Sequence, residues 1–194
     1  MARRAVPATL ARMDISVHTL RGAHPVETGW VDEALSSAYG AGEPLGALVG
    51  RPLSTGTGIM LVGWAVGGPD RFHMFESRSG DAAGPATYMQ VVTFEGPRTG
   101  EWAAAEERAA SGRLWPAVRD VAGIVRVMRM RRADGGYLVV VLSITADAFD
   151  EAQRAILSTD LLPGEDPAQM AGPDSVVIYR LMHADLPVDE PVTS

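Results

Sequence analysis

The sequence contains no cysteine among its 194 residues. This absence excludes disulfide bridges, thiolate metal sites and cysteine nucleophiles, and it agrees with a reducing compartment, so we expect a cytoplasmic protein. No apolar run approaches the ~20 residues that a membrane-spanning helix needs. The net charge of −7 argues against nucleic acid or an anionic membrane surface as a partner, because both select for clustered Lys and Arg.

Several motifs of enzyme chemistry are also missing. The "GTG" at 56–58 is not a phosphate-binding loop, because no Gly-Lys-Ser/Thr follows it. No two histidines have the spacing of metal ligands on a helix, and no Gly-x-Ser-x-Gly elbow occurs. We therefore expect no metal site, no nucleotide-phosphate site and no serine-hydrolase site.

The composition is that of a globular protein with a substantial core. Hydrophobic residues make up 46% and charged residues 21%, and the length suits one domain or two small ones. Residues 1–12 contain arginines but no apolar centre, so they predict a loose tail and not a secretory signal. Whether translation starts at Met1 or Met13 stays open.

The second half has a clear order of elements. "ATYMQVVTFEG" predicts a strand, and "TGEWAAAEERAASGRLW" predicts a helix that Pro116 interrupts or ends. "GIVRVMRMRR" and "YLVVVLSI" flank "ADGG" as a hairpin, "TADAFDEAQRAILS" predicts an amphipathic helix, and "SVVIYRLMHADL" a last strand. Residues 86–194 therefore predict a ferredoxin-like β-α-β-β-α-β unit.

The first half, residues 13–85, predicts a degenerate copy of the same unit. "MDISVHTLR" and "GIMLVGWAV" are strand-like, and "PVETGWVDEALSSAYG" has helical spacing. The Gly/Pro-rich connection at 40–58 has room for a short strand, and "PDRFHMFES" predicts a short helix. The segment "GDAAGPATYMQVV" either closes the first unit or opens the second.

A ferredoxin-like unit leaves one face of its sheet uncovered. In the second half we expect that face to be apolar and to carry nine residues: Tyr88, Gln90, Val92, Phe94, Met128, Met130, Tyr137, Val139 and Val141. Leaving such a face in water costs about 25 cal/mol per Å². The predicted fold class is therefore α+β, with tandem ferredoxin-like units closing into one α+β barrel.

With this pattern the chain resembles the dimeric α+β barrel superfamily, and within it the antibiotic-biosynthesis-monooxygenase-like proteins. The likeness rests on the second-half elements quoted above and on "LVGWAVGGPDRFHMFES", which is similar to the family's strand-end Trp and short helix. Family members usually build the barrel from two chains. Here both halves lie in one chain, which can still form a homodimer.

The resemblance implies a cofactor-independent monooxygenase that acts on a flat hydrophobic aromatic or phenolic molecule. Alternation along the strands nominates residues for a cavity inside the barrel. The expected catalytic residues are Trp64 to orient the rings, Arg126 to hold developing charge and His18 to accept a proton. The expected substrate-binding residues are Met60, Tyr88, Gln90, Met128 and Tyr137.

Two alternatives remain open. Such monooxygenases often place an Asn near the substrate, and this chain has none, which favours a non-catalytic barrel that binds a small apolar ligand or acts in regulation. A barrel filled by its own side chains, or a haem-binding protein, is a further alternative. In the haem-degrading branch of the superfamily, an axial histidine typically follows a helix tryptophan by about ten residues. Here no histidine follows the predicted short helix at that distance. The connections at 40–58 and 161–174 are lids or plain loops.

Overall fold

The computed structural model describes residues 13–20, 29–40, 42–54, 56–65, 70–166 and 172–187. The predicted tail at 1–12 lies outside them. The described elements run in this order: β1 (Met13–Leu20), α1 (Gly29–Gly40), β2 (Gly46–Pro52), β3 (Gly58–Trp64), β4 (Phe72–Ser79), β5 (Tyr88–Phe94), α2 (Gly100–Ala109), η2 (Ala110–Leu114), α3 (Trp115–Val118), β6 (Ile124–Arg132), β7 (Tyr137–Ser143), α4 (Asp147–Leu157) and β8 (Ser175–Ala184).

The eight strands form one closed antiparallel barrel in the order β1-β3-β2-β8-β5-β7-β6-β4, with β4 paired back to β1. Within this ring, β4-β1-β3-β2 and β8-β5-β7-β6 have the same internal order. Each group is therefore a ferredoxin-like sheet, and the two sheets join at the β2–β8 and β4–β6 seams. The predicted α+β barrel with two ferredoxin-like halves in one chain is confirmed.

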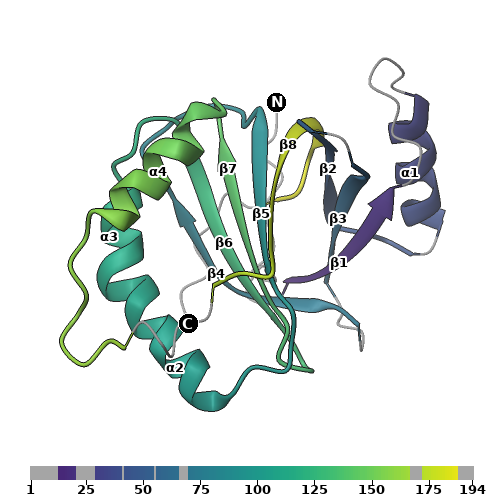
Figure 1. The fold of residues 1–194 in the computed structure, drawn as a ribbon. Coiled ribbons are helices and arrows are strands. Elements are labelled where there is room, and N and C mark those ends of the chain that lie inside the picture. Colours follow the sequence, from purple (N-terminus) through teal and green to yellow (C-terminus); the bar gives the residue numbers. More distant parts are fainter. Residues whose placement is uncertain are drawn as a thin grey trace, which may run out of the picture.

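Helices cover opposite sides of this barrel (Figure 1). The layer formed by α2, η2, α3 and α4 lies against the second-half strands, and α1 lies on the other side against the first-half strands. The hairpin predicted around "ADGG" is confirmed as β6–β7. Its Gly135 has φ +90°, and an added Cβ would come within 2.9 Å of the Arg98 nitrogen, so this turn requires glycine. In the part of the chain that is described, no helix is long and apolar enough to span a membrane.

The first half differs from its prediction in one element. The short helix expected at 69–77 is wrong, because 72–79 form strand β4. Phe72 and Met74 are buried while His73 between them is exposed, which is the period of a strand. Pairing with β6 and β1 fixes this conformation, and only the barrel supplies those partners. The short strand expected at 40–58 is confirmed as β2, and β4, not β5, closes the first unit.

The barrel interior is a packed core and not the predicted cavity. Methionines from both halves fill it with at most 2% of their surface exposed: Met13, Met74, Met89, Met128 and Met130. Leucine, isoleucine and phenylalanine side chains pack between them. Close packing of this kind leaves the interior to the protein's own side chains.

Cross-strand register decides which side chains face this interior. Gln90 pairs with Val141, and Met128 pairs with Val140, so Gln90 and Met128 lie on opposite faces of the wall. Met128 and Met130 face the interior as expected. The prediction is wrong for the other seven residues, which face the helices: Tyr88, Gln90, Val92, Phe94, Tyr137, Val139 and Val141. A register shift between Ile124 and Arg126 decides which side chains of β6 face the interior.

Candidate functional site

A cavity of about 410 Å³ lies between the second-half sheet and its helices. Its floor is the outer face of β5, β6 and β7, and its roof is the layer of α2, η2, α3 and α4. Most lining side chains are apolar: Val92, Phe94, Ala110, Leu114, Trp115, Val118, Ile124, Val127, Val139, Val141, Phe149, Ala152, Ile156, Leu157, Pro173 and Val176. The polar lining residues are Gln90, Glu106, Arg129 and Gln153. We call this space the helix-side cavity.

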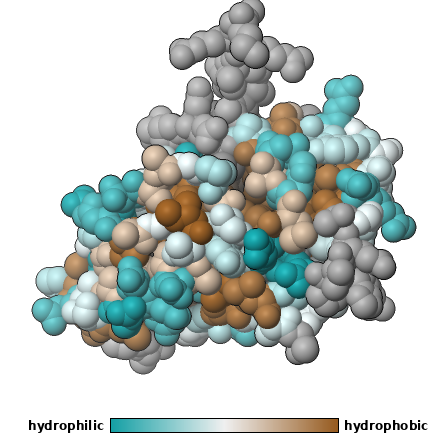
Figure 2. Space-filling view, turned by 90° about the horizontal axis from the view of Figure 1, so that it is seen from above, coloured by the Kyte–Doolittle hydropathy of each residue, from teal (hydrophilic) through white to brown (hydrophobic). Residues whose placement is uncertain are grey.

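A second cavity of about 490 Å³ adjoins the first and shares Phe94, Glu106, Leu114, Ile156, Leu157 and Pro173 with it. It lies toward the loop after α4, where Thr159 and Leu161 line it. Leu157 is 74% exposed at this end, so the entrance has an apolar rim. In the view from above, hydrophobic residues form separate groups among hydrophilic ones (Figure 2).

The π-helix η2 shapes the roof. α2 continues through η2 into α3, so Pro116 lies inside a continuous helix, just after a π-turn that accommodates its missing N–H. The prediction that Pro116 interrupts the helix thus takes the form of a wide turn just before it. Ala110 and Leu114 face the cavity. Gly112 lets the loop approach, because an added Cβ would lie 2.8 Å from the Leu162 Cδ1.

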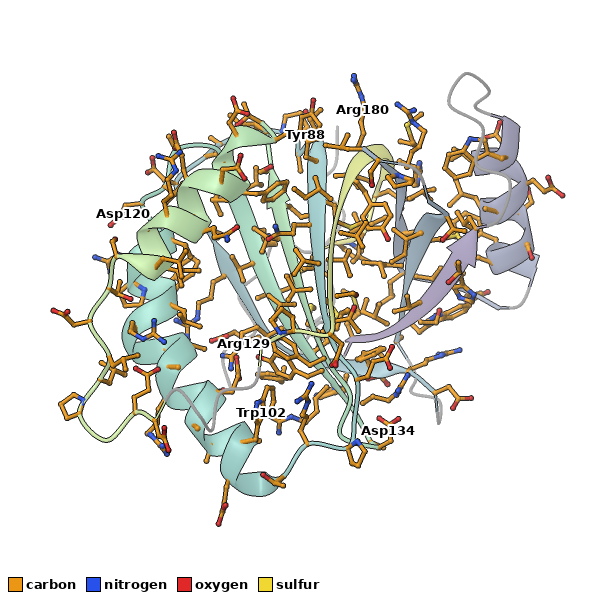
Figure 3. The ribbon with its side chains drawn as sticks, in the orientation of Figure 1. Tyr88, Trp102, Asp120, Arg129, Asp134 and Arg180 are labelled. Carbon is orange, nitrogen blue, oxygen red and sulfur yellow. The ribbon has the colours of Figure 1, made fainter. Side chains whose placement is uncertain are left out.

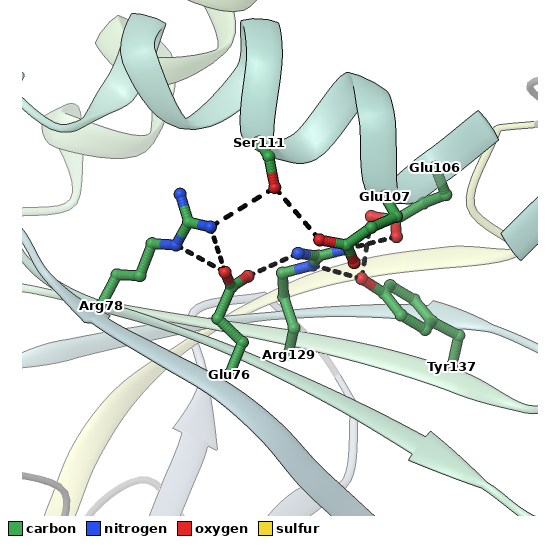
Figure 4. A network of polar contacts seen from close by, with 7 residues as sticks. All are labelled: Glu76, Arg78, Glu106, Glu107, Ser111, Arg129 and Tyr137. Atoms are coloured by element: carbon green, nitrogen blue, oxygen red, sulfur yellow. Dashed lines mark hydrogen bonds and ion pairs between the residues drawn. The ribbon is translucent and has the colours of Figure 1, made fainter. Parts of the chain in front are cut away.

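The polar end of the cavity is built around Arg129 (Figure 4). Its Nε donates to the Tyr137 hydroxyl at 2.6 Å, and its Nη1 donates to Glu76 at 2.5 Å. Its Nη2 donates to Glu106 at 2.6 Å and to Glu107 at 2.8 Å. The side chain of Arg129 is only 5% exposed, so these partners, and not water, compensate its positive charge.

Further contacts tie this group together. The Tyr137 hydroxyl donates to Glu106 Oε1 at 2.8 Å. Arg78 pairs with Glu76, and Ser111 bridges Arg78 and Glu107. We call these seven residues the Arg129 cluster: Glu76, Arg78, Glu106, Glu107, Ser111, Arg129 and Tyr137 (Figure 4). The cluster joins β4 of the first half to β6, β7 and α2 of the second.

The pKa values in the cluster follow from these contacts. Burial raises the pKa of the Tyr137 phenol and the nearby Glu106 raises it further, so the phenol stays protonated. Burial alone would lower the pKa of Arg129, but Tyr137, Glu106 and Glu76 outweigh it and the pKa is raised. Burial likewise opposes ionisation of Glu107, yet the bond and charge of Arg129 leave its pKa lowered.

Aromatic rings brace the same end of the sheet. Tyr137 meets Trp102 edge-on with ring centres 5.5 Å apart, and Phe94 lies 5.7 Å from Tyr137. Trp102, Ala105 and Ala109, which helical spacing puts on one face, are the buried residues of α2. Tyr88 lies at the opposite end of the sheet from Trp102 and Asp134 (Figure 3).

The sequence-predicted site residues lie in three separate places. Gln90 lines the helix-side cavity and Tyr137 belongs to the Arg129 cluster. Tyr88 packs near Ile124 and Phe149, outside the lining. Met128 is in the barrel interior, and so is Arg126, which donates to Ser77 at 3.0 Å and to Ser79 at 3.1 Å.

The other three predicted residues lie on the α1 side of the barrel. Met60 and Trp64 pack against α1, and Trp64 Nε1 donates to Ser16 Oγ at 2.9 Å. Ser16 Oγ lies 2.8 Å from Nε2 of the exposed His18. Burial and the charge of Arg71 lower the pKa of His18. Trp64 and His18 are thus linked through Ser16 on the α1 side, whereas Arg126 lies inside the barrel, so the structure does not bring the three side chains together at one place.

Sequence reasoning missed Arg129 and Glu106, the charged residues of the cavity. One signal was available: alternation in "RVMRMRR" puts Arg129 on the face opposite Met128 and Met130. Glu76 carried no signal, because it comes from the other half and reaches Arg129 only across the β4–β6 seam.

The donor set around the cavity contains no imidazole. Among the described residues that line it there is no histidine, so they offer haem iron no such ligand. No group of three His, Asp or Glu suited to a metal ion occurs in the described ranges.

No protein-family model and no curated protein matches the sequence. Solved structures do match. A candidate monooxygenase from Fusobacterium nucleatum has a TM-score of 0.57 at 9% identity, covering 93% of this chain and 96% of that one. An anthrone oxidase-like protein has a TM-score of 0.54 at 16% identity, covering 89% and 91%. A major regulator of staphylococcal pathogenesis has a TM-score of 0.56 at 10% identity, covering 89% and 99%.

These likenesses extend over nearly the whole of each chain. At 9–16% sequence identity they show a shared fold. The chain therefore shares the α+β barrel fold of these solved structures.

Proposed function

We propose that the chain binds a flat, hydrophobic aromatic or phenolic molecule in the helix-side cavity and oxidises it with molecular oxygen, without a bound cofactor. The observation that carries this proposal is the cavity itself. It offers a largely apolar space of about 410 Å³, in which Gln90, Glu106, Arg129 and Gln153 are the polar lining residues. Such a lining favours fused rings that carry one or two oxygens.

The chemistry asks little of the protein. A phenolate or enolate of the anthrone type can pass an electron to oxygen, and the resulting radical pair combines to a peroxide. Loss of water then leaves a carbonyl, so that R₂CH₂ and O₂ give R₂C=O and H₂O. The protein has to bind the rings, exclude bulk water and stabilise the anion.

The described residues suit these tasks. The valines of the floor and the aliphatic side chains of α4 can hold the rings from two sides. The amide groups of Gln90 and Gln153 can orient a ligand oxygen by hydrogen bonding. Arg129 supplies positive charge near a developing anion. The likeness to an anthrone oxidase-like protein supports the same class of substrate.

A non-catalytic binding protein is the second candidate. One observation favours it: Arg129 is already held by Tyr137 and three carboxylates, which leaves little of its charge for a ligand. In this case the cavity takes up the same kind of molecule and releases it unchanged.

Oxygen uptake with anthrone as substrate tests both candidates. Ala152→Phe places a ring in the cavity from α4, and Ala104→Phe on the exposed side of α2 is the matched control. We expect uptake of one O₂ per anthrone, abolished in Ala152→Phe and kept in Ala104→Phe.

The other outcomes also decide. Anthrone-induced thermal stabilisation without uptake, lost in Ala152→Phe, would replace the enzyme by the binding protein. Neither uptake nor stabilisation would overturn both candidates. Uptake that survives in Ala152→Phe would move the site elsewhere.

A further inference from the structure

The polar end of the helix-side cavity is uneven in charge. Three carboxylates, Glu76, Glu106 and Glu107, meet two guanidinium groups, Arg129 and Arg78 (Figure 4). When all five are ionised, the cluster carries one net negative charge. A further negative charge brought by a ligand would be repelled, and the low dielectric of the cavity would strengthen this repulsion.

The hydrogen-bonding capacity is uneven as well. The guanidinium of Arg129 has five N–H donors, and four contacts to Tyr137, Glu76, Glu106 and Glu107 occupy most of them. Each oxygen of Glu106 accepts one bond, from Tyr137 and from Arg129, and keeps a second lone pair. Glu106 also lines both cavities. Around Arg129 and Glu106 the cavity can therefore accept a hydrogen bond more readily than it can donate one.

Other charged groups near this end are paired with a carboxylate or exposed to solvent. Arg98 packs over Trp102 and is paired with Asp174 at 2.7 Å, and Arg113 is paired with Glu165 at 2.8 Å. Arg131 lies over Phe75 at an exposed position on β6. Of the charged residues lining the two cavities, Glu106 is the carboxylate that reaches both.

We propose that the cavity selects a neutral ligand bearing a hydroxyl group, and that Glu106 accepts the hydrogen bond and then the proton of that hydroxyl. This inference rests on the proposed function and names its substrate class and its base. In the step, the ligand O–H bond breaks, its electron pair stays on the ligand oxygen, and the proton passes to a Glu106 carboxylate oxygen.

The total charge of ligand and cluster is unchanged by this transfer. Glu106 becomes neutral as the ligand becomes anionic, so the new phenolate takes the place of one carboxylate beside Arg129. A ligand that arrives already anionic would instead add a second uncompensated charge. The same cavity therefore discriminates between a phenol and a carboxylate of equal size.

Three naphthalenes of similar shape test the selection on the unmodified chain. They are 2-naphthol, which can donate a hydrogen bond, 2-methoxynaphthalene, which cannot, and the anion 2-naphthoate. Titration calorimetry at neutral pH should give the naphthol an affinity about tenfold or more above the methoxy compound, as expected for a hydrogen bond to a charged group. The naphthoate should bind most weakly.

Two variants on α2 locate the effect. Glu106→Gln removes the acceptor charge in the cavity, whereas Glu107→Gln removes the same charge from a residue that does not line it. We expect Glu106→Gln to reduce the preference for naphthol over the methoxy compound, because a neutral amide oxygen is a weaker acceptor than a carboxylate, and to raise the affinity for naphthoate. Glu107→Gln should keep the preference for naphthol. Thermal unfolding of each variant confirms that it is folded.

Two results would overturn the inference: naphthoate binding as tightly as naphthol to the unmodified chain, or a preference that survives unchanged in folded Glu106→Gln. Because the ranking is measured without any variant, a Glu106→Gln chain that does not fold still leaves the inference open to refutation. Binding of all three compounds with equal affinity, lost in Ala152→Phe, would sink the inference and keep the proposed cavity. Failure of all three to bind would count against the proposed function itself.

Discussion

At the scale of the residue, Arg129 links strand β6 to β4 and α2 through ion pairs with three carboxylates. Its guanidinium is buried and contacts four acidic or phenolic side chains. Removing one partner of a buried ion pair leaves the others charged in a poor solvent, which costs more than the pair contributes. The alternation of "RVMRMRR" was enough to place this arginine opposite the interior methionines, but not to reveal its partners.

We expect Arg129→Met to lower the free energy of unfolding by about 3–5 kcal/mol, because Glu76, Glu106 and Glu107 lose their common counterion. Urea denaturation at neutral pH measures this. Arg119→Met is the control, since Arg119 is exposed and pairs with the exposed Asp120, and its effect should stay within about 0.5 kcal/mol. A loss below about 1 kcal/mol for Arg129→Met, typical of surface pairs, would contradict the burial described here.

The lowered pKa of Glu107 gives a dependence on pH. Its carboxylate stabilises the fold fully at pH values above its ordinary pKa of about 4.3, and this contribution is lost as the pH falls through the lower folded value. The difference in unfolding free energy between the unmodified chain and Glu107→Gln should therefore be constant near neutrality and shrink below about pH 4.3. A difference that grows on acidification would reverse the sign of the effect.

At the scale of the element, the loop after α4 is held against the roof of the cavity. Arg113, in η2, donates to both oxygens of Glu165 at 2.8–3.2 Å and to Thr159 at 3.1 Å. Glu165 also accepts from the Leu162 backbone N–H at 2.8 Å. The sequence left this connection open as lid or loop, and it lies beside the cavity entrance.

Glu165→Ala should release this loop. The amide hydrogen of Leu162 loses its acceptor, so its exchange with solvent should accelerate by about tenfold or more, in line with the loss of a charge-assisted hydrogen bond. Hydrogen–deuterium exchange measures this. Asp160→Ala, at an exposed position of the same loop, should leave the Leu162 rate unchanged. Equal rates in all three chains would show that Arg113 and Glu165 do not anchor the loop.

The elements were largely predictable where local pattern decides them. The second half follows its periodicity, as the buried face of Trp102, Ala105 and Ala109 illustrates. β4 was not, because Phe72–Ser79 becomes a strand only through pairing with β1 and β6. The paired residues are distant in the chain: the nearest pair, Ser79 and Arg126, is 47 positions apart. Non-local pairing of this kind overrides short-range propensity.

At the scale of the whole molecule, two sheets close on a core of methionine and aliphatic side chains. That closure was predictable from an apolar sheet face that needed cover. The side on which the cavity lies was not predictable, because it follows from cross-strand register: Gln90 opposite Val141 sends one set of side chains toward the helices, and Met128 opposite Val140 sends the other inward. Side chains fill the interior, and the space for a ligand lies instead between the second-half sheet and its helices.

The most direct test of this account is a crystal structure of the chain in complex with 2-naphthol. We expect the rings between α4 and the β5–β7–β6 sheet, with the hydroxyl oxygen within hydrogen-bond distance of Glu106. A naphthol bound inside the barrel beside Met128 and Arg126, or on the α1 side beside Trp64, would contradict it.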